Sequence, residues 1–528
     1  MKPLSTYLNG SSRQSMEPLL KEKEKEDPCS RSSSPSSISS AGTWNPGPLV
    51  RRQKLFGIIA FIGLLAVFVA GWHTHKKYGP SQPSTFDITL HLKEEPYVVA
   101  KDGQKIFDWR EDAFLPSTPS ISTRVSEKVQ RLAGYDVPKP APPKHTLSVQ
   151  PKVASLEGLP DNVRNEEIVF GFTSPYRRVR EMCSTWKHFL QHGSHCVIVL
   201  PKEEIVYKQE LEYYLEQEGV NCKIDTVDLG QYPRYEHRVM NMPRTMYTHQ
   251  WTDTQGNPIQ PKWYVVADDD TQILDMSTLR REMSAREHTE DHMLCAVTES
   301  KTQLGRHGKI CYGGGGILMS ASLTQKMAAR MGECLWWHHW RFGGDEMVTH
   351  CASTVMSTAE KNVAPADTFE ELVGLHQVDI PGDGSGVFQS GLPFLSIHHY
   401  TGWLSIFPDW HAPDRMDALR RLQRSVSFLG GDNLFKRFVF DDGSTLVSLG
   451  YSITLYSQPL KKYEMSLMEK TYRNEEHELR WPARPRIHEG KAKGRFKTTY
   501  YLLDVIEEEK LMIYQNRAND TIRIHLEM

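Results

Sequence analysis

The chain has 528 residues, of which 63 are Lys or Arg and 65 are Asp or Glu, so its formal net charge is −2. This length exceeds one ordinary domain, and a hydrophobic fraction of 39% with a mean hydropathy of −0.50 excludes a multi-span membrane protein. The near-neutral balance argues against a nucleic-acid partner, and eight cysteines are too few for a small disulfide-built fold.

An apolar segment at residues 55–72 predicts one N-terminal transmembrane helix. It reads LFGIIAFIGLLAVFVAGW and carries no charge; as a helix it would span about 27 Å of a hydrocarbon core of roughly 30 Å. A buried core helix or a cleaved signal peptide fits less well, because the segment is apolar on every face and follows about fifty polar residues. The flanking basic residues slightly favour a cytosolic N-terminus, and residues 1–50 have the composition of a disordered cytosolic tail.

This orientation places everything after the span in the lumen of the secretory pathway, as in a Golgi type II membrane protein. Seven of the eight cysteines follow the span, and the oxidising lumen permits disulfides among them. Because seven is odd, at least one thiol is expected to be free or intermolecular. Cys334 and Cys351 bracket an aromatic segment and could form a disulfide that fixes it, although their spacing alone does not establish the bond.

The remainder divides into three parts. Residues 73–165 are proline-rich and predict a stem, although a short strand such as 86–92 can still pack on a domain. Residues 166–410 contain apolar runs without alternation, separated by helical stretches, which predict an α/β domain with a parallel sheet buried on both faces. Residues 411–528 predict a β-rich C-terminal extension. The four runs expected in the parallel sheet are 168–172, 196–200, 223–227 and 263–267.

The triplet Asp268-Asp269-Asp270 directly follows the last of these apolar runs. Three adjacent carboxylates repel one another unless a cation or solvent offsets their charge. Carboxylate oxygens suit Mg²⁺ or Mn²⁺, and ligands of open α/β sheets bind beyond the carboxyl ends of the strands. We therefore favour a divalent metal site over an acidic turn.

Three further segments are candidates, each with a simpler structural alternative. Gly313-Gly314-Gly315-Gly316 lets the backbone approach a ligand but has no phosphate-loop lysine, and by itself it equally fits a flexible turn. The segment 336–346 (WWHHWRFGGDE) combines an aromatic surface with Asp345 and Glu346, which suits a sugar site with a carboxylate base, although some tryptophans could be core. His398-His399 is by itself more typical of a surface or core pair than of a metal site.

Taken in order, these motifs resemble the Fringe-like glycosyltransferases of glycosyltransferase family 31, and most closely the Fringe-related membrane proteins of plants and fungi. The likeness extends from about residue 166 to the end of the chain. The matching segments are IVFGF at 168–172, KWYVVADDDTQIL at 262–274, GGGGILMS at 313–320, FGGDEMVTHC at 342–351, GLHQVDIPGDGSG at 374–386, LPFLSIHHY at 392–400 and SLGYSITLY at 448–456.

The resemblance implies a GT-A-type nucleotide-sugar-binding sheet that is flanked by helices. It also implies roles for individual residues. Asp345 would be the catalytic base, although its neighbours depart from the usual paired pattern and leave Glu346 as a fallback. The metal ligands would be Asp268, Asp270 and a late histidine, for which His399 fits better than His398. Donor contacts would come from Asp269, Arg178 and Thr173, while the glycines 313–316 with Trp337 and Trp340 would hold donor and acceptor in line.

The function implied by the resemblance is inverting transfer of a hexose or N-acetylhexosamine from a UDP-sugar to a glycan or glycoprotein hydroxyl, forming a β1,3 linkage. The cofactor would be Mn²⁺ or another divalent cation. The alternative, in a different class, is a membrane-anchored carbohydrate-binding protein with a catalytically inactive domain. The intact aspartates and histidines favour the enzyme, because a binding protein has no need to keep them.

Overall fold

The computed structural model describes residues 162–190, 193–431, 433–440, 443–465, 467–472, 479–490 and 494–527, and the backbone of 85–92, 113–114 and 144–149. All of them belong to a compact unit that runs from Gln82 to Met528. The predicted cytosolic tail and the predicted transmembrane helix at 55–72 lie outside the described residues. Among the described helices, none has the length and apolar character needed to cross a bilayer.

A seven-stranded sheet occupies the middle of the sequence, with the order β13-β11-β12-β9-β4-β5-β6. Its four parallel strands are β4 (Ile168–Thr173), β5 (His195–Leu200), β6 (Cys222–Thr226) and β9 (Trp263–Ala267). The parallel arrangement of the four predicted runs is therefore confirmed, but the sheet as a whole is mixed. On its other side β12 (Tyr312–Ser320) pairs antiparallel with β9, β11 (Met293–Ala296) pairs antiparallel with β12, and β13 (Glu370–Glu371) completes the edge.

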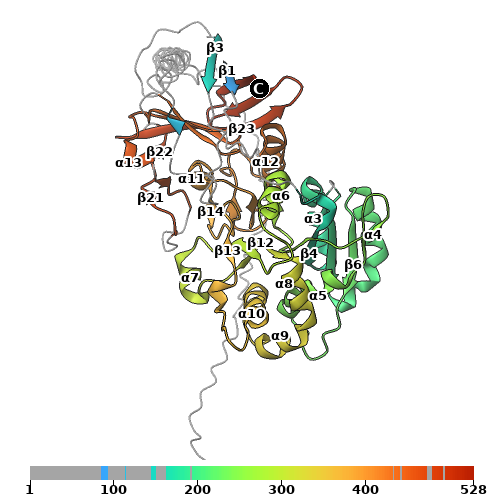
Figure 1. Cartoon of the computed structure of the whole chain (residues 1–528). Helices are drawn as coiled ribbons and strands as arrows, with labels where there is room; N and C mark the ends of the chain where they lie inside the picture. The colour runs from blue at the N-terminus through green and yellow to red at the C-terminus, as the bar shows by residue number, and fades with distance from the viewer. Residues whose placement is uncertain are drawn as a thin grey trace, which may run out of the picture. The chain divides into compact units, whose positions relative to one another are not determined.

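Helices cover both faces of this sheet, as the continuous apolar strands require. Alternate residues of each strand enter two separate cores, so that Phe170 and Val265 face one layer while Val169 and Tyr264 face the other. Figure 1 shows α3 and α4 beside β4 and β6, and α8, α9 and α10 grouped together. The first core receives α3 (Tyr176–Leu190), α4 (Lys208–Gln217) and α6 (Met276–Ser284); the second receives α5 (Tyr235–Thr248), α8 (Ala321–Ala329), α9 (Met331–His338) and α10 (Gly344–Met356).

A ten-stranded sheet forms the C-terminal part, with the order β2-β17-β18-β19-β23-β24-β25-β1-β3 and β22 beside β23. Three of its strands come from the predicted stem, and the short strand expected at 86–92 is present as β1. The strands are β1 (Thr85–Leu92), β2 (Ala113–Phe114), β3 (Lys144–Val149), β17 (Arg437–Phe440), β18 (Thr445–Ser448), β19 (Ser452–Tyr456), β22 (His488–Glu489), β23 (Phe496–Ile506), β24 (Leu511–Gln515) and β25 (Thr521–Glu527).

The core beneath this sheet also includes residues from the domain predicted to end at residue 410. Leu274, Val378, Ile380 and Phe407 share one hydrophobic cluster with Tyr451 and other residues of the C-terminal strands. The two predicted domains therefore have no separate cores at this boundary. The remaining helices are α7 (Lys301–His307), α11 (Ser385–Phe388), α12 (Arg415–Leu429) and α13 (Lys462–Met465).

Short strand pairs join segments that are distant in sequence. Two of them hold the loops around the site: β10 (Gln272–Ile273) pairs antiparallel with β15 (Ser396–Ile397), and β14 (Gly382–Asp383) pairs parallel with β16 (Leu404–Ser405). The others are β7 (Trp251–Thr252) with β8 (Pro258–Ile259), and β20 (Met468–Glu469) with β21 (Ala483–Arg484).

Three disulfides occur among the described residues. Cys196–Cys222 joins neighbouring strands, Cys295–Cys311 joins β11 to the start of β12, and Cys334–Cys351 joins α9 to α10 with a Cα separation of 5.2 Å. The seventh cysteine after the predicted span, Cys183, is free and buried in α3. This pattern fits the expected odd thiol and suits an oxidising compartment.

Candidate functional site

The aspartate triplet lies where the central strand β9 ends, in the turn that leads to β10. The turn is fixed locally: the Thr271 hydroxyl accepts a hydrogen bond from the Asp268 backbone N–H at 3.1 Å and donates to the Gly314 carbonyl at 3.0 Å. Three carboxylates are thus held at the carboxyl end of a buried strand, where open α/β sheets bind ligands.

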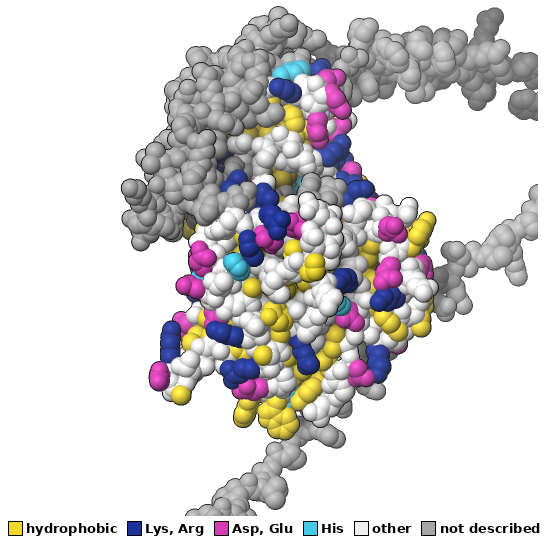
Figure 2. Space-filling model, turned by 45° about the vertical axis from the view of Figure 1, so that its right-hand side comes forward, with side chains coloured by type: hydrophobic (Ala, Val, Ile, Leu, Met, Phe, Trp, Pro, Cys, Tyr) yellow, Lys and Arg dark blue, Asp and Glu magenta, His cyan; other side chains and the backbone are white. Residues whose placement is uncertain are grey.

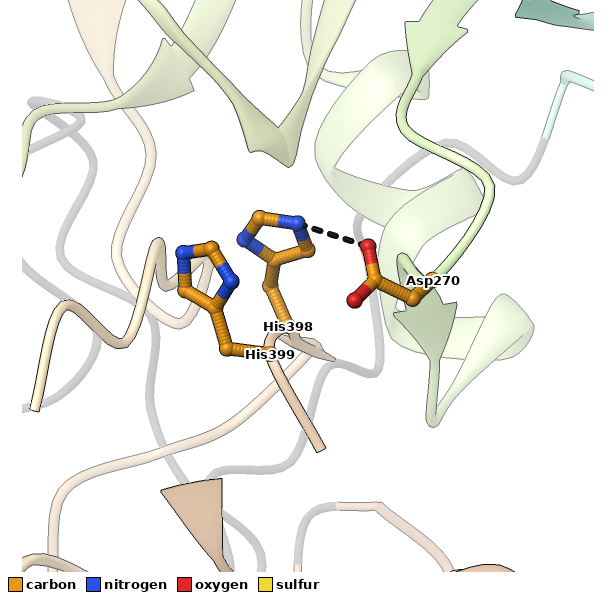
Figure 3. Close-up of side chains that lie close together, drawn as sticks. All are labelled: Asp270, His398 and His399. Atoms are coloured by element: carbon orange, nitrogen blue, oxygen red, sulfur yellow. Dashed lines mark ion pairs between the residues drawn. The ribbon is translucent and has the colours of Figure 1, made fainter. Parts of the chain in front are cut away.

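The histidine pair reaches these carboxylates because β10 follows the triplet and β15 precedes the histidines. Antiparallel pairing of the two strands brings His398 against Asp270, with 2.9 Å between His398 Nε2 and Asp270 Oδ1 (Figure 3). Asp268 Oδ2 lies 3.4 Å from the same nitrogen. Asp270, His398 and His399 form a group whose potential ligand atoms all lie within 4.8 Å of one another.

The two histidines differ in what they contact. His398 is 3% exposed and faces the aspartates, whereas His399 directs Nε2 toward Asp379 Oδ1 at 3.2 Å. The resemblance favoured His399 as the metal ligand. The structure brings both rings to the site and places His398 closest to Asp268 and Asp270. Adjacent positions in a loop give no sequence signal that would have separated them.

Asp269 points away from the histidines and joins a different set of groups. Arg178 Nη2 donates to its Oδ1 at 2.8 Å and the Ser174 hydroxyl donates to its Oδ2 at 2.6 Å. The expected donor residue Thr173 is 2% exposed, and its hydroxyl has no hydrogen-bond partner among the described residues. Ser174, which sequence reasoning missed, is the neighbouring residue that contacts Asp269.

The four glycines lie in β12, not in the turn that one interpretation of the sequence allowed. They bulge from the strand, because Ala296 pairs with Tyr312 while the adjacent Cys295 pairs with Ile317. The bulge makes room for the site: a Cβ on Gly314 would lie 2.0 Å from His398 Nδ1, closer than any side chain could allow. Glycine at this position is therefore needed for the histidine to reach the aspartates.

Asp345, at the start of α10, borders the same bulge. The Gly313 backbone N–H donates to Asp345 Oδ2 at 3.4 Å, and a Cβ on Gly313 would lie 3.4 Å from Asp268 Oδ1 and 3.6 Å from Asp345 Cβ. Glu346 turns elsewhere, into an ion pair of 2.6 Å with Arg341. The structure therefore brings Asp345 to the triplet and leaves the fallback residue engaged by an arginine.

The carboxylates of the site shift one another's ionisation. Burial, then repulsion from Asp345, Asp270 and Asp269, raises the pKa of Asp268 to about 7 despite an opposing effect of His398. Burial also raises the pKa of Asp345 above its usual range, and backbone N–H donors offset part of that rise. Asp268 keeps 36% side-chain exposure, so solvent moderates the shift of its pKa.

Asp270 and His398 behave as a coupled ion pair. Burial would raise the pKa of Asp270, but the hydrogen bond and charge of His398 hold that pKa well below its usual range. Burial would lower the pKa of His398, but Asp270 and then Asp268 raise it above its usual value. A protonated histidine thus offsets part of the aspartates' charge when no metal is bound.

Tyr235, at the start of α5, is a further residue that sequence reasoning missed. Burial of the hydroxyl, with the charges of all four aspartates, raises its pKa well above the ordinary value. Its O–H therefore stays protonated and remains a hydrogen-bond donor within the field of the four aspartates, although 42% of the residue is exposed. No local motif marks this tyrosine, because α5 begins nearly thirty residues before β9.

The tryptophans of the segment 336–346 lie on the surface. Figure 2 shows hydrophobic side chains gathered along the lower edge of the molecule, at the height of α9 in Figure 1. The exposed fractions are 63% for Trp336, 59% for Trp337, 66% for Trp340 and 77% for Phe342. Trp340 is held by its indole N–H, which donates to the Trp337 carbonyl at 2.9 Å.

The residues present fit a divalent cation. Carboxylate and imidazole donors together suit Mn²⁺ and neighbouring first-row metals. Four aspartates gather here, and Arg178 and His398 are the positive side chains in direct contact with them. Asp270 with His398 and His399 would supply the ligands, with Asp268 beside them.

Residues 306–521 match a family described as a protein of unknown function, DUF604. No curated protein matches the sequence significantly. Three similar solved structures are glycosyltransferases by their descriptions. GlyE of Streptococcus pneumoniae is 11% identical with a TM-score of 0.26, the match covering 40% of this chain and 45% of that one. The chain thus spans less than half of the pneumococcal protein's length.

The other two structures are equally distant. Mouse xyloside xylosyltransferase 1 is 11% identical over 34% of this chain and 78% of that one, with a TM-score of 0.23. A mannosyltransferase from Pyrobaculum calidifontis, solved with GDP-Man and Mn²⁺, is 10% identical over 51% and 68%, with a TM-score of 0.25. Scores of this size carry no conclusion about this chain.

Proposed function

We propose that this protein is a divalent-cation-dependent glycosyltransferase. It moves a hexose or N-acetylhexosamine from a UDP-sugar to a glycan or glycoprotein hydroxyl, with inversion and formation of a β1,3 linkage. One observation carries the proposal: the half-buried carboxylate of Asp345 lies across Gly313 from an aspartate triplet that contacts His398. This arrangement supports a metal-ligating group and a separate carboxylate base on two sides of one small bulge.

The residues divide the chemistry between them. The bound cation would supply charge stabilisation for the departing diphosphate. Asp345, whose pKa is raised by burial, takes the proton from the acceptor hydroxyl on the opposite side of the sugar from the leaving group. Arg178 pairs with Asp269 and orients it. One displacement without a covalent intermediate inverts the anomeric carbon.

The exposed aromatic residues are proposed as an acceptor surface. Trp337 and Trp340 belong to the same segment as Asp345, and the Arg341–Glu346 ion pair ties that segment to α10. Flat aromatic faces suit the apolar faces of sugar rings, which supports a glycan acceptor. The predicted span, the type II orientation and the Golgi location complete the proposal, and the three disulfides support an oxidising lumen.

The decisive experiment assays the purified full chain against a panel of UDP-sugars and glycan acceptors, with and without Mn²⁺. Mn²⁺-dependent transfer from at least one donor is expected. Asp270→Ala should lose Mn²⁺-dependent UDP binding and transfer together, because it removes the carboxylate paired with His398. Glycan binding without transfer or hydrolysis of any donor would instead favour the carbohydrate-binding protein, and unchanged UDP affinity in Asp270→Ala would refute the metal role.

A further inference from the structure

We infer that the segment Gln377-Val378-Asp379 is a positioning device that orients both histidine rings of the metal site, with Asp379 as its principal residue. The inference rests on the proposed cation site, and it explains which residues hold the two histidine rings in their orientations. It also gives the C-terminal sheet a part in the site, because Val378 is anchored in that sheet's core.

Each histidine gives one ring nitrogen to this segment. His398 Nδ1 lies 3.3 Å from the Gln377 carbonyl oxygen, and His399 Nε2 lies 3.2 Å from Asp379 Oδ1. A carbonyl or carboxylate oxygen can only accept, so both of these nitrogens carry the proton in the neutral rings. The opposite nitrogens, Nε2 of His398 and Nδ1 of His399, are left as ligand atoms.

This arrangement is the one that metal-ligating histidines generally require. The second ring nitrogen donates to a carboxylate or a backbone carbonyl, which fixes the tautomer and the ring orientation and makes the ligand nitrogen more basic. Here a single three-residue segment supplies one acceptor of each kind. The two rings pack with 3.7 Å between centroids, so a shift of one would disturb the other.

The backbone is strained on both sides of these contacts, in the segment 377–379 and at the histidine pair. Val378 has φ of 55° and His399 has φ of 61°, values in the left-handed region that a β-branched residue such as valine strongly disfavours. Such outliers persist only where the surrounding structure holds them, and they gather at functional sites. Val378 is 1% exposed within the C-terminal core, which is what holds it.

Asp379 is itself held in place by buried groups. The Thr298 hydroxyl donates to Asp379 Oδ2 at 2.5 Å, which leaves Oδ1 for His399. The Asp379 backbone N–H donates to Glu299 Oε2 at 3.4 Å, and Glu299 Oε1 lies 3.1 Å from His376 Nδ1. The Asp379 side chain is only 7% exposed, so water cannot readily replace it as the acceptor for His399.

The test measures Mn²⁺ affinity, which requires no turnover. The full chain is titrated with Mn²⁺, and the free ion is followed by its electron paramagnetic resonance signal. Asp379→Ala should weaken binding about 10–100-fold, the usual effect of removing an outer-shell partner of a ligating histidine. Asp379→Asn keeps a carbonyl oxygen toward His399 and should recover part of that affinity, remaining about threefold or more weaker than the parent.

The matched control is Asp383→Asn, four residues further along. Asp383 is also partly buried, but its carboxylate pairs with Arg486 at 3.2 Å and contacts neither histidine. The Mn²⁺ affinity of the Asp383→Asn variant should therefore stay within about twofold of that of the parent. Melting of each metal-free variant checks folding, and Asp379→Asn decides the matter if the alanine variant does not fold.

Two outcomes would overturn the inference in distinguishable ways. If Asp379→Asn and Asp379→Ala bind Mn²⁺ as the parent does while Asp270→Ala does not, the cation site stands and the positioning role of Asp379 is wrong. If the parent chain itself binds no Mn²⁺, the proposed cation site and the inference both fall.

Discussion

Two charge clusters in this molecule are built on opposite principles. The aspartate cluster, made of Asp268, Asp269, Asp270 and Asp345, gathers like charges beside the bulge in β12. In the C-terminal ion cluster, Glu469 lies 2.7 Å from Lys497 and 3.4 Å from Arg484. One cluster is acidic and partly exposed, whereas the other is charge-compensated and buried.

The pKa directions express the same difference. In the C-terminal ion cluster burial opposes both charges, yet the partners lower the pKa of Glu469 and raise that of Lys497. In the aspartate cluster burial and repulsion together raise the pKa of Asp268 and burial raises that of Asp345. A buried charge paired with its neighbours is costly to leave unpaired, whereas a carboxylate that its neighbours oppose marks a candidate functional site.

The largest expected effect is the loss of transfer activity in Asp345→Asn, with no change in the binding of UDP. Removing a general base typically costs about 10²–10⁴-fold in rate, and asparagine cannot take the acceptor's proton. Mn²⁺-dependent UDP binding should stay unchanged, because Asp345 is not among the residues grouped around His398. Transfer rates and UDP affinity measured on the same preparation test both parts.

Glu346→Gln is the matched control for that variant. Its carboxylate is paired with Arg341, so we expect transfer to remain within about tenfold of the parent. Full activity in Asp345→Asn together with loss in Glu346→Gln would transfer the base role to Glu346.

Lys497→Met should have the largest effect on stability. Removing one partner of a buried ion pair leaves the other charge uncompensated, at a cost of about 3–5 kcal/mol in the free energy of unfolding. Lys497 and Glu469 are 2% and 1% exposed, so little solvent is available to replace the lost lysine. Denaturant unfolding of the parent and the variant measures the difference.

The surface pair Lys202–Asp228 provides the contrast. Both side chains are more than 60% exposed, and Lys202→Met should change the free energy of unfolding by no more than about 1 kcal/mol. Equal effects of the two lysine substitutions would mean that the C-terminal ion cluster is not the buried, compensated cluster described above.

The sequence predicted the parts of the site that depend on local pattern. An apolar run followed by three aspartates marks a strand end, and the glycines before Ile317 mark a place where the backbone must come close to something. Which of the two histidines faces Asp270 could not be predicted, because the residues are adjacent in a loop and the backbone at His399 takes a left-handed φ of 61°. Asp379 was equally hidden, since it meets His399 across twenty residues of sequence.

The fold shows the same limit. The parallel strands were predicted because each is a short, continuous apolar run. The strands of the predicted stem join a sheet whose other strands begin at Arg437, and β1 pairs with β25, more than 400 residues away. Periodicity within a window of a dozen residues cannot report a partner at that distance. The C-terminal core likewise draws in Leu274 and Val378, which no boundary read from composition anticipates.

The smallest expected effect is a change in melting temperature when Asp268 of the aspartate cluster is replaced. The direction of that change distinguishes the aspartate cluster from the C-terminal ion cluster. The folded-state pKa of Asp268 is about 7, above the ordinary value of 3.8, so the native state retains a proton that the unfolded state has released. Stability from this group is therefore present at low pH and falls as pH rises toward and through about 7. Asp268→Asn cannot ionise, and it should raise the melting temperature of the metal-free protein at pH 8 by about 2 °C, a shift that allows for solvent screening.

Below about pH 3.8, the ordinary pKa, Asp268 is protonated in both the native and the unfolded state, so the two proteins should melt together there and diverge as the pH rises toward about 7. Mn²⁺ should reverse the order at pH 8, because the parent gains more from the cation than the variant does. Asp228→Asn, in an exposed pair with Lys202, should show neither the pH dependence nor the reversal. A melting temperature that falls in metal-free Asp268→Asn would mean that the carboxylate is satisfied by its neighbours, and the aspartate cluster would then be of the same kind as the C-terminal ion cluster.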